Sequence, residues 1–579
     1  MPSRPGGGLL SCAVAERESR VAKALQARAA EKLAVARAQA YQERAVPAGL
    51  RWALTVLASL GDWAEATLVA LRRRRSTGAP PTCEPDGEAV TITGTAFSRD
   101  VGQRLMLPFE VRPGTARLVV SVEGKDLPPV PPRNPLTETV LDVGLWDEHG
   151  YRAAEGFRGW SGSRHATVFV QADDATRAYR PGPVGAGIWH VDLGIAAVGP
   201  TGVDWTVTIE ARSHPDPPAQ PRRPAVTGPV DPRHVARPAP GWYHGDFHMH
   251  AWHSSAKGPE PARVVELARA AGLDFLPLTE YVVGHHWDEY GAVQEANPDV
   301  LIWPGREIIT YAGHVQSLGE TPGFIEFRHG FEDVRIGDIQ REVRDRGALF
   351  QVNHPTTFPG ELFRSLCRGC EFRLGDAIDW GAVDTIEVLT GEALVDPKEY
   401  GLPDFGVRAP NPFFDSAVDL WERLLNQGHR ITAVCGSDDK SGARYGACAT
   451  AVHAAELSRP ALVDAIRAGR AYVRARGVAA SPALELEAAA PGQPAGTFGS
   501  ALTVDGPDAQ AELRVTVRGG QGQVLRLVRA GRVASTVTVD RDPFERAFPI
   551  TGAATWYRVE TADARGRTTI GNPVFLESP

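Results

Sequence analysis

The alternation of two hydrophobic patterns between Trp242 and Val478 restricts the fold of this chain more than any other feature. Short apolar runs that end in polar residues alternate with amphipathic segments that each close on a glycine, as a helix does at its C-cap. The runs are WYHGDFHMH, LDFLPLTEY, VLIWPGREI, ALFQVNHP, DTIEVLTG and ITAVCGSD, and the amphipathic segments are PARVVELARAAG, DIQREVRDRG, AVDLWERLLNQG and PALVDAIRAG. Strands that alternate with helices predict a parallel sheet or barrel over residues 241–480.

The segments on either side of this region have other patterns. Residues 86–214 and 481–579 hold short segments of alternating polarity between Gly, Pro and Asp turns, and each predicts a β-sandwich. The proline-rich residues 215–240 predict an extended linker. Residues 1–80 predict a basic helical arm that either docks on the body or binds a membrane surface or an acidic partner. The predicted fold class is therefore multidomain α/β plus all-β.

Composition narrows the functional classes. A net charge of −8 does not favour a nucleic-acid-binding surface. We see no secretory signal, and charges interrupt the most apolar window, Leu50–Leu71, so we expect no transmembrane segment and a cytoplasmic location. Six cysteines are too few for a disulfide scaffold, and Cys435 is expected in the core. The Cys367/Cys370 pair lacks the second cysteine pair of a structural zinc site, and only a His or Asp could complete one.

Polar side chains gather where the predicted strands end. They are Asp246, His248, His250, Glu280, Glu307, His354 and Asp438. Parallel α/β folds bind ligands at the carboxyl ends of their strands, and burying this many charges is costly unless a cation pairs them. His248 and His250 lie two residues apart in one strand, so they share a face and can hold one ion.

The ordered set of segments resembles the PHP (polymerase and histidinol phosphatase) superfamily, and within it the CehA/McbA branch of carbaryl-hydrolase-like enzymes. The matching segments are GDFHMH (245–250), LDFLPLTEY (273–281), GHHW (284–287), PGREIITYAGHVQSLG (304–319), FQVNHPTTFPG (350–360), CRGC (367–370), DTIEVLTG (384–391), HRITAVCGSDDK (429–440), LVDAIRAGRAYVRA (462–475) and GNPVFL (571–576). The resemblance covers residues 89–579. It implies a distorted seven-stranded β/α (TIM-like) barrel with metals at its carboxyl end, flanked by two β-domains.

The resemblance also implies two divalent transition-metal ions, for which Zn, Mn and Fe fit about equally. Carried over residue by residue, the superfamily's ligand pattern falls on six positions of this chain. The first ion's ligands are His248, His250, Glu307 and Asp438, and the second ion's are Glu307, His314 and His354. Glu307 would bridge the two ions, and a hydroxide between them would be the nucleophile.

Superfamily members with three ions have further ligands that this chain lacks. Their positions hold Tyr281 and Lys440 here, and another falls near residues 255–257. We therefore hypothesise a binuclear site in which the Lys440 ammonium, with Lys257 as a second contributor, replaces the charge of the missing ion and binds a substrate oxygen. The alternative is that Lys440 points to solvent.

Other side chains are expected near the centre. Tyr281 is predicted to donate its hydroxyl either to the substrate or to Glu280. His285 and His286 are candidates for the general acid that protonates the leaving group, the alternative being plain surface residues. Asp246 and Glu280 are expected to support the ligands from behind.

These features predict a metal-dependent hydrolase that cleaves a phosphoester, ester or carbamate bond of a small-molecule substrate. The missing third ion favours a phosphodiester, ester or carbamate over a phosphomonoester. The alternative is a non-catalytic protein that binds carbohydrate or protein on a PHP-like scaffold, for which four tryptophans offer either a sugar-binding face or core packing. They are Trp146, Trp160, Trp189 and Trp205. A homo-oligomer is compatible with the sequence.

Overall fold

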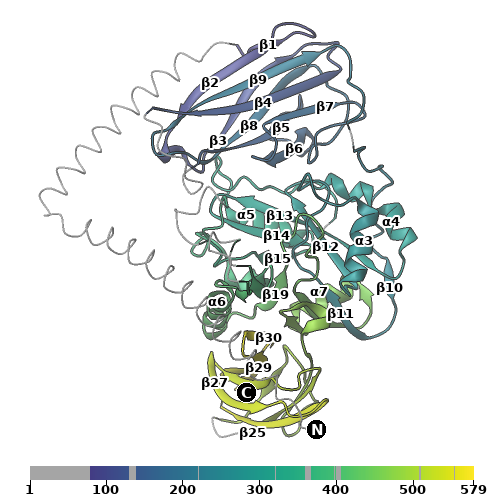
Figure 1. Cartoon of the computed structure of the whole chain (residues 1–579), viewed down its shortest axis with the longest axis vertical. Coiled ribbons are helices and arrows are strands. Elements are labelled where there is room, and N and C mark those ends of the chain that lie inside the picture. Colours follow the sequence, from purple (N-terminus) through teal and green to yellow (C-terminus); the bar gives the residue numbers. More distant parts are fainter. Residues whose placement is uncertain are drawn as a thin grey trace, which may run out of the picture. The chain divides into compact units, whose positions relative to one another are not determined.

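The structure is a computed structural model. It describes residues 79–128, 138–219, 221–319, 321–358, 367–396, 398, 406–506, 510–552 and 554–578. One compact unit, Thr82–Leu394 with Phe413–Pro579, contains every element discussed below. The predicted helical arm lies outside the described residues except for its last two. The described chain is mixed α/β, with many strands and few helices (Figure 1), and none of its described helices is long and apolar enough to cross a membrane.

Seven strands of one sheet form the centre of the chain. They are β11 (Gly241–Gly245), β12 (Phe275–Tyr281), β13 (Leu301–Thr310), β14 (Gly313–Leu318), β15 (Leu349–Val352), β16 (Thr385–Thr390) and β19 (Thr432–Gly436). They are hydrogen-bonded in the order β19-β16-β15-β14-β13-β12-β11. The amphipathic segments form α3 (Pro261–Ala270), α5 (Ile336–Asp345), α6 (Phe414–Asn426) and α7 (Arg459–Arg467). A glycine with positive φ follows each of these helices within two residues, as the sequence predicts.

The sheet is not parallel throughout, in contrast to the prediction. β14 runs antiparallel to both β13 and β15, because the chain folds back through a tight turn in which Thr310 pairs with Gly313. The Thr310 hydroxyl donates to the Gly313 carbonyl over 2.6 Å, and Gly313 adopts a φ of +152°. No helix separates these two strands, so the alternation that indicates parallel pairing is interrupted here.

Backbone hydrogen bonds join the two ends of this path of strands. The Phe247 N–H donates to the Cys435 carbonyl (3.1 Å), and the Asp438 N–H donates to the His248 carbonyl (2.8 Å). The residues that follow β11 therefore pair with the end of β19, which brings His248 and Asp438 side by side. The distorted TIM-like barrel stays a prediction with which this closure is compatible.

The N-terminal region consists of two sheets, with strand orders β1-β3-β8-β5-β6 and β2-β9-β4-β7. The strands are β1 (Thr82–Cys83), β2 (Val90–Ala96), β3 (Arg104–Val111), β4 (Arg117–Asp126), β5 (Val140–Trp146), β6 (Phe157–Gly162), β7 (Thr167–Gln171), β8 (Gly187–Ala197) and β9 (Val203–Arg212). Side chains from both sheets share one core, as expected of a sandwich. The four tryptophans considered for a sugar-binding face are at most 6% exposed, so they pack in cores instead.

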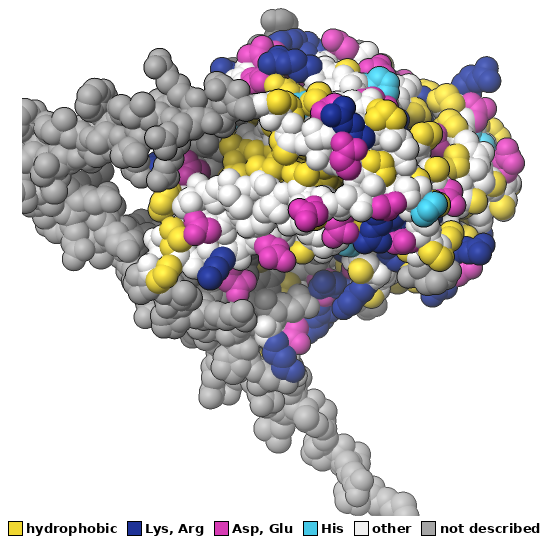
Figure 2. Space-filling view, turned by 90° about the horizontal axis from the view of Figure 1, so that it is seen from above, with side chains coloured by type: hydrophobic (Ala, Val, Ile, Leu, Met, Phe, Trp, Pro, Cys, Tyr) yellow, Lys and Arg dark blue, Asp and Glu magenta, His cyan; other side chains and the backbone are white. Residues whose placement is uncertain are grey.

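The described surface seen in Figure 2 carries charges of both signs. Lys and Arg side chains alternate with Asp and Glu side chains, and no continuous basic area is visible among the described residues of this face. The expectation that the chain does not bind nucleic acid stays a prediction.

The C-terminal region continues the central sheet. β20 (Ala449–Ala454) pairs with β11 and with β22 (Ala471–Arg474), and β22 pairs with β30 (Gly566–Gly571). The remaining strands are β23 (Ala483–Ala489), β24 (Ala501–Thr503), β25 (Gln510–Arg518), β26 (Val524–Arg529), β27 (Arg532–Thr538), β28 (Phe544–Thr551), β29 (Thr555–Asp563) and β31 (Val574–Glu577). The Asn572 amide accepts from the Ala433 N–H (2.8 Å) and donates to the Ala471 carbonyl (2.9 Å), which ties this region to β19.

The structure contains two disulfides among its described residues, which the sequence analysis did not predict. Cys435 is buried in β19 as predicted, but it is joined to Cys448, which immediately precedes β20. Their Cα atoms are 6.2 Å apart, within the usual range for a disulfide. The second disulfide joins Cys367 to Cys370.

A buried ion network joins α6 to the C-terminal region. Arg558 contacts Glu422 over 2.6 Å and Glu560 over 2.8 Å, and Arg567 contacts Glu560 over 3.0 Å. Burial by itself raises the pKa of Glu560, but the two guanidinium groups outweigh it and lower the pKa from 4.5 to about 2.

Glu560→Gln is expected to lower the free energy of unfolding at pH 7 by about 3 kcal/mol, because it leaves buried arginine charge uncompensated. The pKa of Glu560 is lower in the folded chain than in the unfolded chain. Its contribution to the free energy of unfolding is therefore complete above pH 4.5 and is lost as the pH falls through about 2. Urea unfolding of wild type and variant at pH 7 and pH 3 measures this. The exposed Glu545→Gln serves as control, and a difference that does not shrink at the lower pH would contradict the prediction.

Candidate metal centre

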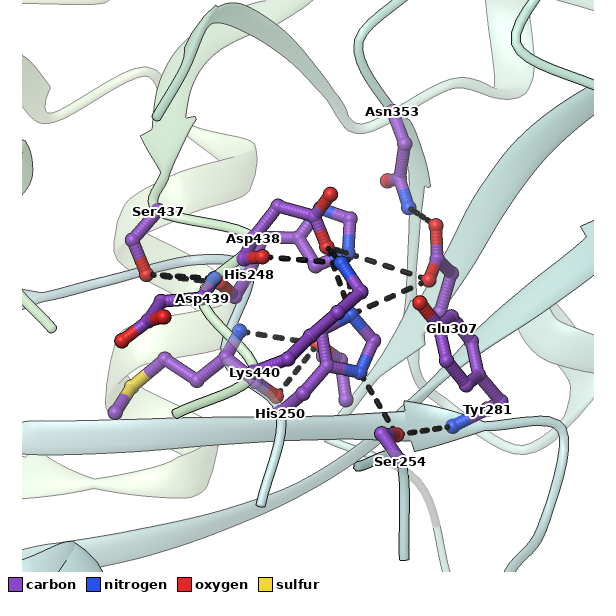
Figure 3. Close-up of polar contacts among 12 residues, drawn as sticks. His248, His250, Ser254, Tyr281, Glu307, Asn353, Ser437, Asp438, Asp439 and Lys440 are labelled. Atoms are coloured by element: carbon purple, nitrogen blue, oxygen red, sulfur yellow. Dashed lines mark hydrogen bonds and ion pairs between the residues drawn. The ribbon is translucent and has the colours of Figure 1, made fainter. Parts of the chain in front are cut away.

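Four side chains converge on one point between the end of β11, β13 and the end of β19 (Figure 3). The Nε2 atoms of His248 and His250 are 3.1 Å apart. Asp438 Oδ1 lies 3.3 Å and 2.9 Å from these two nitrogens. Glu307 Oε2 lies 3.4 Å from both. These are the four residues that the sequence assigns to the first ion.

The other oxygen of Glu307 faces a second set of histidines. Glu307 Oε1 lies 3.0 Å from His314 Nδ1 and 3.4 Å from His354 Nε2. The antiparallel turn at the start of β14 is what brings His314 beside Glu307, because it pairs His314 with Ile309 of β13. The Cys370 sulfur lies within 4.8 Å of ligand atoms of these two histidines, but it is joined to Cys367 in a disulfide and is therefore not counted as a ligand.

The charges of the first set fit a bound cation. Burial lowers the pKa of His248, but the carboxylates of Glu387, Glu307 and Asp438 outweigh it and raise this pKa well above 6.5. Burial would raise the pKa of Glu307, which the neighbouring histidines instead hold well below its usual value. Glu307 Oε2 is buried and has no well-oriented hydrogen bond. An unsatisfied carboxylate oxygen that faces two imidazole nitrogens is the donor arrangement of a divalent transition-metal site.

Outer hydrogen bonds orient the first pair of histidines. His248 Nδ1 lies 2.8 Å from Glu387 Oε1, and His250 Nδ1 lies 2.9 Å from the Ser254 hydroxyl. The Ser254 oxygen also accepts the Tyr281 N–H over 3.2 Å, and its second lone pair can accept from His250 Nδ1, the direction that binding of a metal through His250 Nε2 requires. Both Nε2 atoms are then free to act as ligands, the arrangement of carboxylate–histidine–metal sites.

Glu387 is the functional residue that sequence reasoning missed. Its Oε2 accepts the His354 N–H (2.8 Å) and the Thr390 hydroxyl (2.8 Å), so one carboxylate supports both ligand sets. The available signal in the sequence was an acidic residue between the apolar Ile386 and Val388 of strand β16. An unpaired charge there would be costly, so a partner was to be expected.

Asp246 and Glu280, the two predicted supporting residues, hold loops. Asp246 Oδ1 accepts the Ser437 N–H over 2.8 Å, its Oδ2 accepts the Gly446 N–H over 3.0 Å, and burial raises its pKa to about 6. Glu280 Oε1 accepts the His253 N–H over 2.9 Å. Neither carboxylate contacts a ligand atom of the cluster. Both instead accept hydrogen bonds from backbone N–H groups of the neighbouring loops.

Lys440 and Tyr281 lie at the open side of the cluster. Lys440 Nζ contacts Asp438 Oδ1 over 2.5 Å, and Figure 3 shows its side chain running alongside His250. The Tyr281 ring packs on the His250 ring with centroids 4.5 Å apart and lies 5.8 Å from Lys440 Nζ. Lys440 thus contacts the cluster while 32% of its side chain stays exposed. Lys257 is exposed and has no contact with the cluster in the described structure.

His285 and His286 pack around His253, with ring centroids 5.0 Å and 6.1 Å from it. His286 also lies against Trp287 and is fully buried. Burial, together with nearby positive charge, holds the pKa values of both histidines well below 6.5. No described contact joins either of them to the ligand set, so the general-acid role stays a prediction without a contact in its favour.

Two of the candidate ligands adopt strained backbone conformations. His354 has a φ of +28° and Asp438 a φ of +47°, a region that side chains other than glycine rarely adopt. Such conformations persist where the surroundings enforce them, and they concentrate at functional sites. Each of these residues follows the end of a strand, where the chain turns toward the cluster.

Comparison with known proteins adds little to this geometry. No family model and no curated protein matches the chain. Among solved structures it is similar to a two-domain protein from Bacteroides vulgatus that contains a predicted PHP-like metal-dependent phosphoesterase, with 17% identity over 61% of this chain and 99% of the other and a TM-score of 0.32.

Two other structures are similar over shorter stretches. PsfC from Pseudomonas syringae shares 18% identity over 39% of this chain and 87% of its own, with a TM-score of 0.25. The lesion-specific endonuclease PfuEndoQ from Pyrococcus furiosus shares 14% identity over 40% of this chain and 58% of its own, with a TM-score of 0.27. At such identities and TM-scores these likenesses carry no argument about the fold or reaction of this chain.

Metal content tests the two ligand sets separately. We expect about two transition-metal ions per chain, one ion in His354→Gln, and none in Glu307→Gln, because Glu307 alone belongs to both sets. Mass spectrometry of dialysed protein measures this. His149→Gln is the control, since His149 belongs to another, more exposed acidic group. Loss of metal in this control, or retention of both ions without Glu307, would be inconsistent with the assignment.

Glu387→Gln tests the supporting carboxylate. We expect both sites to fill at high metal concentration, with affinity reduced about 10- to 100-fold, because the neutral Gln amide is a weaker acceptor than a carboxylate for the Nδ1–H of His248. Competition with a chromogenic chelator measures the affinity, and the exposed Glu295→Gln is the matched control. Equal affinities in Glu387→Gln and wild type would show that Glu387 has no such role.

Proposed function

We propose that this chain is a metal-dependent hydrolase of the PHP superfamily, CehA/McbA-like, that cleaves a phosphoester, ester or carbamate bond. The observation that carries the proposal is the position of Glu307, whose two oxygens face two separate pairs of histidines. Ions held there would supply Lewis acidity and activate water for hydrolysis. The resemblance of the ordered motifs to the superfamily supports the same reading.

The chain's own residues would bind and orient the substrate. Lys440 places an ammonium beside Asp438 at the open side of the cluster. Once Asp438 is engaged by an ion, that ammonium can donate to a substrate oxygen on which negative charge develops. Tyr281, adjacent to both His250 and Lys440, presents a phenol near the same position.

Activity of the metal-loaded protein tests the proposal. We expect hydrolysis of bis(4-nitrophenyl) phosphate, of an aryl ester or of an aryl carbamate, and loss of this activity in Glu307→Gln together with its metal. Release of the phenol is followed by absorbance. Protein that holds its ions but cleaves none of these compounds would favour the alternative of a binding protein.

Lys440→Met is expected to lower kcat about 100-fold without changing metal content, because it removes one preorganised donor to the developing charge. The exposed Lys125→Met is the matched control. Steady-state kinetics and metal analysis on the same preparations measure the effect. An unchanged kcat in Lys440→Met would exclude the proposed role of the ammonium.

A further inference from the structure

A turn of the N-terminal region reaches the metal centre. Residues 163–166 connect β6 to β7, and the guanidinium carbon of Arg164 lies 4.2 Å from the centroid of the Tyr281 ring. The same ring packs on His250. Arg164 therefore lies one aromatic ring away from a candidate metal ligand, although it belongs to a turn of the N-terminal region.

The turn is held against the central region by Arg368. The Arg368 guanidinium donates to the Ser163 hydroxyl over 2.8 Å and contacts Asp142 over 3.3 Å. Gly162, with a φ of +57°, leaves room for it, since a Cβ there would lie 2.0 Å from Arg368 Nη1. The Arg368 carbonyl accepts from His314 Nε2 over 2.5 Å. One residue thus fixes both the turn and a ligand of the second ion.

The Arg164 guanidinium has one unsatisfied donor within the described part of the chain. Its Nη1 atom is buried and has no hydrogen-bond partner among the described residues. A buried donor without an acceptor is costly, and a guanidinium offers a planar fork suited to carboxylate or phosphate oxygens. Lys440, which also lies near the Tyr281 ring, has Asp438 as its only ion-pair partner in the described structure.

We propose that Arg164 binds a non-bridging oxygen of the substrate and, with Lys440, selects an anionic phosphodiester over a neutral ester or carbamate. The inference rests on the proposed function and narrows its substrate class. Arg164 lies 4.2 Å and Lys440 5.8 Å from the centroid of the Tyr281 ring, so we place the negative group of the substrate beside that ring. Hydrolysis of such a diester adds water across one P–O bond and releases an alcohol and a phosphomonoester.

Kinetics with two substrates of different charge test the inference. In Arg164→Met, kcat/KM for bis(4-nitrophenyl) phosphate is expected to fall about 10- to 100-fold, mainly through KM, while kcat/KM for a neutral aryl carbamate stays within about twofold. Arg164→Lys keeps the charge and is expected to retain part of the activity. Arg112→Met, an exposed arginine of the same region, is the matched control. Equal losses on both substrates, or none, would overturn the inference.

Binding of inorganic phosphate gives a readout that does not depend on turnover. Titration calorimetry on metal-loaded protein is expected to show at least about tenfold weaker phosphate binding in Arg164→Met than in wild type or Arg112→Met, with equal metal content. Equal affinities would refute the inference while leaving the hydrolase proposal intact. Preferential cleavage of the carbamate by wild type would likewise refute the inference and leave the hydrolase proposal intact. Absence of metal from wild type and all variants would instead contradict the proposed function.

Discussion

The centre depends on one buried carboxylate that faces histidines with both of its oxygens. Glu307 is 1% exposed, so its charge has to be compensated by groups that the fold brings to it. Two irregular features of the sheet bring the compensating groups to Glu307. β14 turns back at Gly313 and brings His314 to one oxygen, while the pairing of residues after β11 with the end of β19 brings His248 and Asp438 to the other.

Periodicity predicts much of the local structure. The helices α3, α5, α6 and α7 lie where the amphipathic patterns fall. The polar strand ends include five of the six candidate ligands, and the sixth, His314, comes only from the resemblance to the PHP superfamily. The reversal of β14 escaped prediction because a turn of two residues leaves no mark on the alternation of strands and helices. The role of Glu387 escaped because it acts through His248, 139 residues away in the sequence, and only the folded chain shows that contact.

The position of Arg164 near the metal centre could not be predicted from the sequence, because it too depends on contacts between residues far apart in the chain. Arg164 lies in a turn rich in polar residues, which by pattern is an ordinary surface turn. Its significance comes from Arg368, whose side chain holds the turn and whose carbonyl holds His314. A change in how the two regions pack would therefore also shift a ligand of the second ion, so that domain contact and metal geometry are coupled through one residue.

The pairing of β22 with β30 makes the central sheet depend on residues that come much later in the chain. All six candidate ligands leave the ribosome before residue 440, but the edge of β22 and the backbone of Ala433 find their partners only when residues 566–572 have been made. Until then β19, which leads into Asp438, lacks the amide of Asn572 that ties it to β22. A chain that lacks residues 566–572 would thus carry every candidate ligand without the backbone contacts that hold β19 and β22.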